Sequence, residues 1–377
     1  MPIEKKTLWI AGGFTLLFIF AILLATGTVR LTKKIAKVEL TVGGFDSPAV
    51  WQKITAKYHA DHPTVTVTYR ALSPASYEAD LLNGLASGKG PDIFMIMNTR
   101  LPRHGDKMVP APMEIATTGT VEAAFPFVVA KELTAMGDAY ALPLYMDTYA
   151  LIYNKDLFDK AGIASPPNNW IDLQALAKKL GNPPAGGSVA LGGSDTTIEG
   201  ASDILALLMM QDNVPMIDRD GKVKLTGGEG ALSFYTKFAN PKGGYYAWDN
   251  RPPTAFERFA RGTLPMVLGT HAEVVALHKA NTALRIGVAP MPQAPQAPVN
   301  LATYAALSVW VGSTHPTEAW QFINDLTINL ENALAYAVAS NTPPAHRALI
   351  EQFKTDPDIG VFVSQELTAR PWYRLNE

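Results

Sequence analysis

The sequence predicts an α/β fold, and three observations support this prediction. Within residues 38–96, stretches typical of strands and of helices alternate, as in folds that pack helices against a mainly parallel sheet. The chain has 377 residues, of which 47% are hydrophobic, so it is long enough for two or three domains with buried cores. Further along, a hydrophobic strand at 149–153 leads directly into a short helix after Asn154. Within residues 38–96 we therefore expect parallel strands with right-handed crossovers.

The first expected strand is Val38–Val42, in which apolar and polar residues alternate. Ser47 and Pro48 then begin a helix, because apolar residues recur at helical spacing from Val50 to Tyr58. The next elements, in order, are a strand at 64–69, a helix at 77–85 and a strand at 92–96. Together they form a β-α-β layer.

The middle of the chain contains further helices and a hairpin. An Asp-Gly pair at Asp220 and Gly221 lies between two strand-like stretches and predicts a hairpin turn. The segment 289–298 contains four prolines, so we expect a stiff connector there. The other expected elements are helices at 169–180, 201–211, 229–238 and 253–259, strands at 264–268, 286–288 and 305–311, and mostly helix from 316 onward.

The run 143–160, which contains the strand and helix around Asn154, carries the most specific motif of the chain. Its matching positions are Ala150, Leu151, Ile152, Tyr153, Asn154, Phe158 and Lys160. They resemble the signature of the extracellular solute-binding proteins of the maltose-binding protein class. Tyr145 departs from that pattern, because the family usually has a small or polar residue there. Further stretches resemble the family in the same order: 85–93, 259–266, 307–310 with 313–322, and 341–344.

This resemblance implies a two-lobed periplasmic-binding-protein (Venus-flytrap) fold with the ligand cleft between two α/β lobes. The lobes would comprise 38–146 plus 293–327, and 148–290 plus 330–377. The first crossing between them would lie at 147–150. The implied function is that of an extracytoplasmic component of an ATP-binding-cassette (ABC) transporter, which binds a small solute, preferably a carbohydrate, by hinge closure and delivers it to the transmembrane permease subunits.

Residues 1–37 form a separate region. The 23 residues from Thr7 to Val29 contain no charge, which is enough for a helix to cross a bilayer core of about 30 Å. We expect an N-terminal transmembrane helix that anchors the protein on the extracytoplasmic face of the cell membrane. The alternative is a signal peptide cleaved near Gly27, since small residues at 25–27 follow the apolar run.

Composition excludes several functions. Residues 1–37 contain six basic residues and one acidic residue, so residues 38–377 have a net charge of about -7. This negative charge disfavours nucleic acid as a partner. The chain contains no cysteine, and it lacks the motifs of P-loops, zinc proteases and serine hydrolases, so we expect no cofactor, no metal and no enzymatic activity. Two alternatives stay open: an enzyme on the same scaffold, with Asp46, Asp147 or His271 as acid or base, and a surface protein that senses a ligand and signals to a membrane partner.

The cleft of such a fold collects strand ends and helix starts, so the ligand-binding residues should follow the strands. Aromatic rings and planar polar groups at these places suit a sugar. The residues that we expect to bind the ligand are Phe45, Asp46, Ser47, Asn98, Thr99, Arg100, Tyr145, Asp147, Trp248, His271 and Tyr304.

Overall fold

The computed structural model describes residues 36–181, 187–217, 222–295 and 298–372. The chain divides into two compact units, Met1–Val38 and Glu39–Glu377. Nearly all of the first unit, including the expected membrane helix Thr7–Val29, lies outside the described residues.

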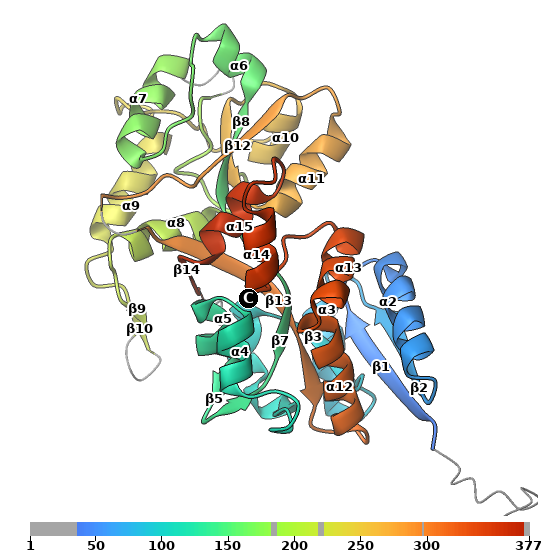
Figure 1. The fold of residues 1–377 in the computed structure, drawn as a ribbon. Coiled ribbons are helices and arrows are strands. Elements are labelled where there is room, and N and C mark those ends of the chain that lie inside the picture. Colours follow the sequence, from blue (N-terminus) through green and yellow to red (C-terminus); the bar gives the residue numbers. More distant parts are fainter. Residues whose placement is uncertain (1–35, 182–186, 218–221, 296–297, 373–377) are drawn as a thin grey trace, which may run out of the picture. The chain divides into compact units, whose positions relative to one another are not determined.

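The larger sheet of the second unit has seven strands (Figure 1). Five of them lie in the order β14 (Ala369–Arg370), β13 (Asn300–Trp310), β3 (Ile93–Met97), β1 (Val38–Gly44) and β2 (Val65–Ala71), while β4 (Met108–Val109) and β7 (Leu142–Thr148) also pair with β13. Strands β1 and β3 are parallel, as expected. The long strand β13 runs antiparallel to β3, β4 and β7, so the sheet as a whole is mixed.

A second sheet has three strands. Its order is β11 (Met266–Gly269), β8 (Ala150–Asn154) and β12 (Ile286–Ala289). Both outer strands are antiparallel to β8. The predicted hairpin is present, because β9 (Met216–Ile217) pairs antiparallel with β10 (Val223–Lys224), although its turn residues lie outside the described part.

The chain passes from the large sheet to the small one at Tyr149. This residue separates β7, which pairs with β13, from β8, which pairs with β11 and β12. The passage falls within the expected crossing 147–150. The chain returns to the large sheet between the end of β12 at Ala289 and the start of β13 at Asn300, which is the segment expected to be a connector.

Helices cover both sheets, and their starts follow local capping rules. Ser47 and Asn154 accept backbone hydrogen bonds at the starts of α2 and α6, while Thr254 and Thr270 form capping boxes with the glutamates three positions later. The helices are α2 (Pro48–Asp61), α3 (Tyr77–Ala86), α4 (Thr118–Ala124), α5 (Phe127–Leu133), α6 (Lys155–Lys160), α7 (Trp170–Leu180), α8 (Ala201–Gln211), α9 (Glu229–Thr236), α10 (Ala255–Ala260), α11 (His271–Ala280), α12 (Pro316–Thr327), α13 (Leu330–Ser340), α14 (Arg347–Phe353) and α15 (Gly360–Glu366). Short 3-10 helices are η1 (Asn98–Arg103), η2 (Gly105–Lys107) and η3 (Lys237–Ala239), and β5 (Thr134–Ala135) with β6 (Asp138–Ala139) form a small hairpin.

The lobe boundaries expected from the sequence stay a prediction. Helix α13 packs against α2, α12 and β7, all of which lie in or beside the large sheet (Figure 1). Helix α15 likewise contacts β7 and β13. Helices of the C-terminal part thus contact elements of the large sheet, and the lobe of 148–290 plus 330–377 stays a prediction.

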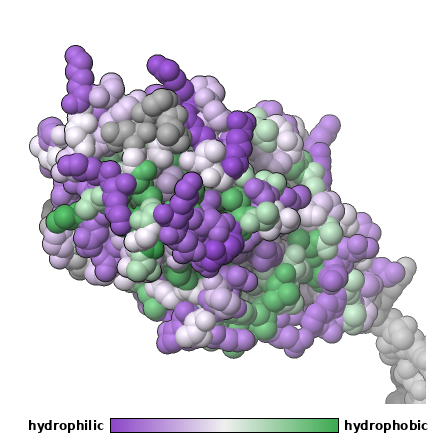
Figure 2. All heavy atoms as spheres, turned by 90° about the horizontal axis from the view of Figure 1, so that it is seen from above, coloured by the Kyte–Doolittle hydropathy of each residue, from purple (hydrophilic) through white to green (hydrophobic). Residues whose placement is uncertain are grey.

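Polar side chains cover much of the face seen in Figure 2, and apolar side chains lie among them in separate groups. Among the described residues, no helix is long and apolar enough to cross a membrane.

Candidate functional site

A cavity of about 400 Å³ lies where α3, η1 and β13 approach α8 and the end of the described chain. It combines rings with charged and hydroxyl groups. Its lining residues are the aromatic Phe45, Tyr77, Tyr145 and Trp372, the charged Glu78, Arg100 and Asp203, and Pro74, Met97, Thr99, Leu301, Ala302 and Thr303. We call this cavity the cleft site.

Four residues expected from the sequence line the cleft site: Phe45, Thr99, Arg100 and Tyr145. Phe45 follows β1, and its ring meets that of Tyr77 edge-on at a centroid distance of 5.0 Å. Thr99 and Arg100 lie in η1, directly after β3. The rule that strand ends line the cleft therefore holds at β1 and β3.

Tyr145 is the position at which the chain departs from the family signature. Its half-buried ring lies in the cleft-site wall, and its hydroxyl approaches Met97 Sδ at 3.9 Å. Burial raises the pKa of the Tyr145 phenol, with Asp46 and Asp147 adding to the effect, so the group is neutral at physiological pH. It offers a ring face and a hydroxyl to the cavity.

Asp46 and Ser47 lie beside the site but do not line it. The Asp46 carboxylate accepts hydrogen bonds from Trp51 Nε1 at 3.0 Å and from the Tyr336 hydroxyl at 2.8 Å. Burial raises the pKa of Asp46, and these two hydrogen bonds oppose the rise. Ser47 caps α2. Both side chains therefore have local structural partners.

Asn98 and Tyr304 are fully buried and hold β3 and β13 together. Asn98 Oδ1 accepts the Tyr304 backbone N–H at 3.2 Å, and Asn98 Nδ2 donates to the Ala302 carbonyl at 3.2 Å. The Tyr304 hydroxyl donates to Glu132 Oε2 at 2.6 Å. These contacts argue against a direct ligand contact by either side chain.

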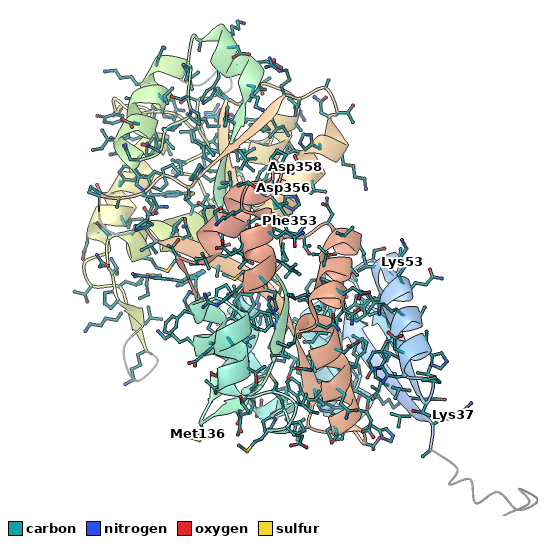
Figure 3. The ribbon with its side chains drawn as sticks, viewed as in Figure 1. Lys37, Lys53, Met136, Phe353, Asp356 and Asp358 are labelled. Carbon is teal, nitrogen blue, oxygen red and sulfur yellow. The ribbon has the colours of Figure 1, made fainter. Side chains whose placement is uncertain are left out.

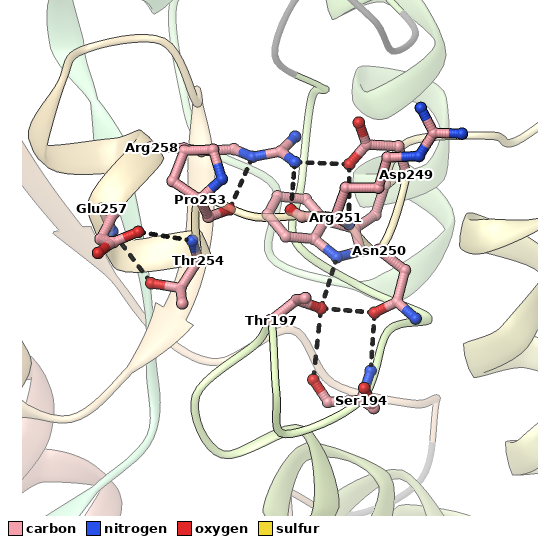
Figure 4. Close-up of polar contacts among 10 residues, drawn as sticks. Ser194, Thr197, Asp249, Asn250, Arg251, Pro253, Thr254, Glu257 and Arg258 are labelled. Atoms are coloured by element: carbon pink, nitrogen blue, oxygen red, sulfur yellow. Dashed lines mark hydrogen bonds and ion pairs between the residues drawn. The ribbon is translucent and has the colours of Figure 1, made fainter.

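Trp248 is also fully buried. It contacts a polar network that includes Thr197, Asp249 and Arg258 (Figure 4). Its Nε1 donates to Thr197 Oγ1 at 3.3 Å, and the Arg258 guanidinium lies 4.2 Å from its ring centroid. Arg258 is in turn paired with Asp249 at 2.6 Å. The network positions a core tryptophan, and Trp248 is not among the residues that line the cleft site.

Asp147 and His271 meet at the passage between the sheets, outside the cleft-site lining. The buried Asp147 carboxylate accepts backbone N–H groups from Thr148 at 2.8 Å, His271 at 3.2 Å and Ala272 at 3.4 Å. Burial raises the pKa of Asp147 to about 7. Burial lowers the pKa of His271, against the opposing effect of Asp358 and Asp356, which lie between α14 and α15 (Figure 3).

Sequence reasoning missed several cleft-site residues: Tyr77, Glu78, Asp203 and Trp372. Tyr77 and Glu78 begin α3, and Asp203 lies in the first turn of α8, so the rule about helix starts could have found them. Trp372 follows the last strand, where no motif marks it. Its Nε1 is buried and has no hydrogen-bond partner among the described residues.

A larger cavity, of about 640 Å³, lies elsewhere, beside α7, α8 and α9. Its walls are mainly apolar, with Trp170, Leu208 and Phe234 among them. Its buried amide, Gln211, already donates to the Pro292 and Val299 carbonyls and accepts from Trp170 Nε1 at 2.6 Å. The cleft site, although smaller, combines four aromatic side chains with two carboxylates and a guanidinium, which favours it as the ligand site.

No group of three or more metal-ligating side chains is present in the described part of the chain. The cleft site offers aromatic rings, carboxylates and a guanidinium for recognition.

Comparison with known proteins agrees with this architecture. Residues 44–327 match the family described as bacterial extracellular solute-binding protein. A binding protein of Brucella abortus (strain 2308) is 26% identical over 174 residues, 46% of this chain and 41% of that protein. The maltotriose-binding protein of Pyrococcus abyssi is 24% identical over 134 residues, 36% of this chain and 28% of that protein. The chain thus aligns with less than half the length of these relatives.

Solved structures show the same fold. The cyclic alpha-maltosyl-1,6-maltose binding protein from Arthrobacter globiformis aligns with a TM-score of 0.75 and 17% identity, over 90% of this chain and 89% of that one. A structure described as CpMnBP1 with mannobiose bound aligns with a TM-score of 0.68 and 21% identity, over 89% of this chain and 90% of that one.

The two-lobed α/β fold expected from the sequence is thereby confirmed, and the family is one of solute-binding proteins rather than enzymes. Because the matching model spans most of the chain, this protein belongs to the family of bacterial extracellular solute-binding proteins.

Proposed function

We propose that this protein is the extracytoplasmic binding component of an ABC importer and that it binds a carbohydrate in the cleft site. The observation that carries the proposal is the lining of that cavity, in which four aromatic residues stand beside Glu78, Arg100 and Asp203. Sugar rings present C–H faces that pack on aromatic rings, and their hydroxyls require polar partners that both donate and accept.

The position of the site supports binding by hinge closure. Most of its wall comes from the large sheet and its helices, whereas Asp203 lies on α8, beyond the crossing at Tyr149. A ligand that touches both sides binds the closed form better, and this difference in affinity shifts the protein towards closure. The closed protein would then dock on the permease subunits.

Relatives narrow the choice of ligand. One curated relative is named for maltotriose, and structural neighbours are named for a cyclic maltosyl-maltose and for mannobiose. We infer that short glucose or mannose oligosaccharides are the first ligands to test. The apolar run Thr7–Val29 would hold the protein at the outer face of the membrane.

The test is a thermal-shift screen of the full-length protein in detergent, followed by calorimetry. Maltotriose and mannobiose would be compared with an amino acid mixture and with short peptides. A bound ligand at 100 times its Kd stabilises the native state by about 2.7 kcal/mol, which a thermal shift detects. Stabilisation by amino acids or peptides, but by neither sugar, would refute the carbohydrate proposal.

A further inference from the structure

His104 lies directly behind a wall of the cleft site. It separates η1, which supplies Thr99 and Arg100 to the cavity, from η2. The His104 side chain is 1% exposed, and its Nε2 lies 2.9 Å from Oε1 of Glu78, whose own side chain is 29% exposed. Glu78 lines the cavity, whereas His104 is not among the lining residues. One carboxylate thus joins a buried histidine to the ligand space.

The hydrogen positions follow from the chemistry of the pair. Burial acts to raise the pKa of Glu78, but the hydrogen bond from His104 and the positive groups around it outweigh burial, so the pKa is lowered. An ionised carboxylate only accepts hydrogen bonds, so His104 Nε2 carries the hydrogen and donates it. His104 Nδ1 is buried without a hydrogen-bond partner among the described residues. A buried lone pair at Nδ1 costs less than an unpaired N–H there, which agrees with a ring hydrogen at Nε2.

We propose that His104 is a positioning residue of the cleft site, which fixes the Glu78 carboxylate so that Glu78 can accept hydrogen bonds from sugar hydroxyls. This inference rests on the proposed carbohydrate function and adds a residue that does not itself touch the ligand. His104 is bonded to Oε1, and no hydrogen bond to the second carboxylate oxygen is present within the described part of the chain, so that oxygen can accept from the ligand. The His104 ring also packs against Phe94 at a centroid distance of 5.8 Å, which helps to hold the donor in place.

Preorganisation explains why such a residue would matter. A glutamate at the start of a helix has three side-chain torsions to order, and ordering them on binding reduces affinity. A buried donor that fixes the carboxylate beforehand removes that cost. His104 should therefore influence affinity entirely through Glu78.

The experiment measures Kd for maltotriose and for mannobiose with the full-length protein and four variants. His104→Phe keeps a ring but removes the donor, and we expect Kd to rise about tenfold. His104→Gln keeps an N–H donor and should restore most of the affinity. Glu78→Ala should weaken binding at least as much as His104→Phe, and the double variant Glu78→Ala/His104→Phe should bind no more weakly than Glu78→Ala alone.

A matched control is His59→Phe. His59 Nδ1 makes a 2.8 Å contact with the Val65 carbonyl, and His59 does not line the cleft site. We expect no change in Kd for this variant. If His104→Phe lowers the melting temperature but binds like the unaltered protein, or if the two substitutions weaken binding additively, the positioning role is refuted.

A second measurement separates this inference from the carbohydrate proposal. Long-range ¹⁵N NMR of the histidine rings reports which nitrogen carries hydrogen, with or without a sugar. The pair is supported if His104 Nε2 carries hydrogen in the unaltered protein and if its ¹⁵N chemical shift changes in Glu78→Ala. This result would support the pair even if neither sugar binds. Hydrogen on Nδ1 alone would overturn it. Failure of the unaltered protein to bind either sugar would instead refute the carbohydrate proposal.

Discussion

At the scale of single residues, Asp147 places a buried carboxylate where the chain passes between two sheets. Its nearest partners are backbone N–H groups, two of which belong to the start of α11. Glu366, fully buried on α15, also has a strongly raised pKa because of burial, and Asp147 contributes to the rise. Both acids therefore bind protons more tightly in the folded state than in the unfolded chain.

We expect the stability of the protein to fall as the pH rises from about 4 to about 7. The pKa of Asp147 is raised from 3.8 to about 7, so its contribution is fully present below the unfolded pKa and is lost as the pH rises through the folded one. In Asp147→Asn the free energy of unfolding should fall less steeply with pH, and the difference in slope is at most about 1.4 kcal/mol per pH unit for one group. Urea unfolding at several pH values measures it.

The asparagine variant is a gentle change, because Oδ1 of Asp147 already accepts two of the three N–H groups. Glu114→Gln is the control, since it removes a carboxylate that is exposed. Equal slopes in the unaltered protein and in Asp147→Asn would show that this carboxylate does not hold its proton in the folded state.

Trp372 lines the cleft site and carries a buried hydrogen-bond donor. Its buried Nε1 has no hydrogen-bond partner among the described residues, and a buried unpaired donor costs about 1–3 kcal/mol. In Trp372→Phe the ring stays and the donor disappears. We therefore expect unchanged or higher stability of the ligand-free protein and, because an aromatic ring still lines the cleft site, a Kd for maltotriose close to that of the unaltered protein. Thermal unfolding and calorimetry measure the two quantities. Lower stability of Trp372→Phe would show that the buried N–H costs the folded state nothing.

Single residues also show what the sequence could not predict. Asn98 and Tyr304 follow or lie in strands, as ligand-binding residues do, yet they are fully buried and bonded to each other's strands. Their partners lie about two hundred positions away in the chain, so only the tertiary structure reveals them. Phe45, Thr99 and Arg100 were predictable because they follow β1 and β3 directly.

At the scale of elements, the strand β8 and helix α6 matched the sequence closely. A hydrophobic run ends at Asn154, whose side chain caps the next helix by accepting the Leu157 N–H at 3.1 Å, so the boundary is encoded locally. The direction of β13 was not predictable, because it depends on which strands it meets. Its pairing with β3, β4 and β7 is set by contacts across the fold.

Helix α15 ties the two passages between the sheets together through Gln365. This buried side chain donates to Thr148 Oγ1 and to the Tyr149 carbonyl, both at 3.0 Å. Its Oε1 accepts the Met291 N–H at 2.8 Å, on the returning segment. One amide thus bonds the outward and the returning chain.

We expect Gln365→Leu to lower the free energy of unfolding by about 1–3 kcal/mol, because it leaves backbone groups at Tyr149 and Met291 unpaired. It should also broaden the distribution of distances between the lobes, measured by fluorescence energy transfer. Ser364→Ala, at an exposed neighbouring position, is the control. If both variants unfold at the same urea concentration, Gln365 does not secure the passages.

At the scale of the whole molecule, two cavities compete for the ligand. The cleft site includes Asp203 on α8 and Glu78 on α3, whereas the larger apolar cavity includes Asp172 on α7. A ligand in the cleft site contacts both sides of the crossing at Tyr149. Changing the ratio of two conformations from 1:99 to 99:1 requires a difference in affinity of about 10⁴-fold, so closure demands several such contacts.

We expect maltotriose to reduce the radius of gyration of the unaltered protein, measured by small-angle X-ray scattering in detergent-matched buffer. Asp203→Asn should weaken binding and require more sugar for the same contraction, since it alters a contact from the α8 side. Asp172→Asn should bind and contract like the unaltered protein. Weaker binding in Asp172→Asn alone would place the sugar in the larger cavity. Binding of maltotriose without contraction would show that binding is not coupled to hinge closure.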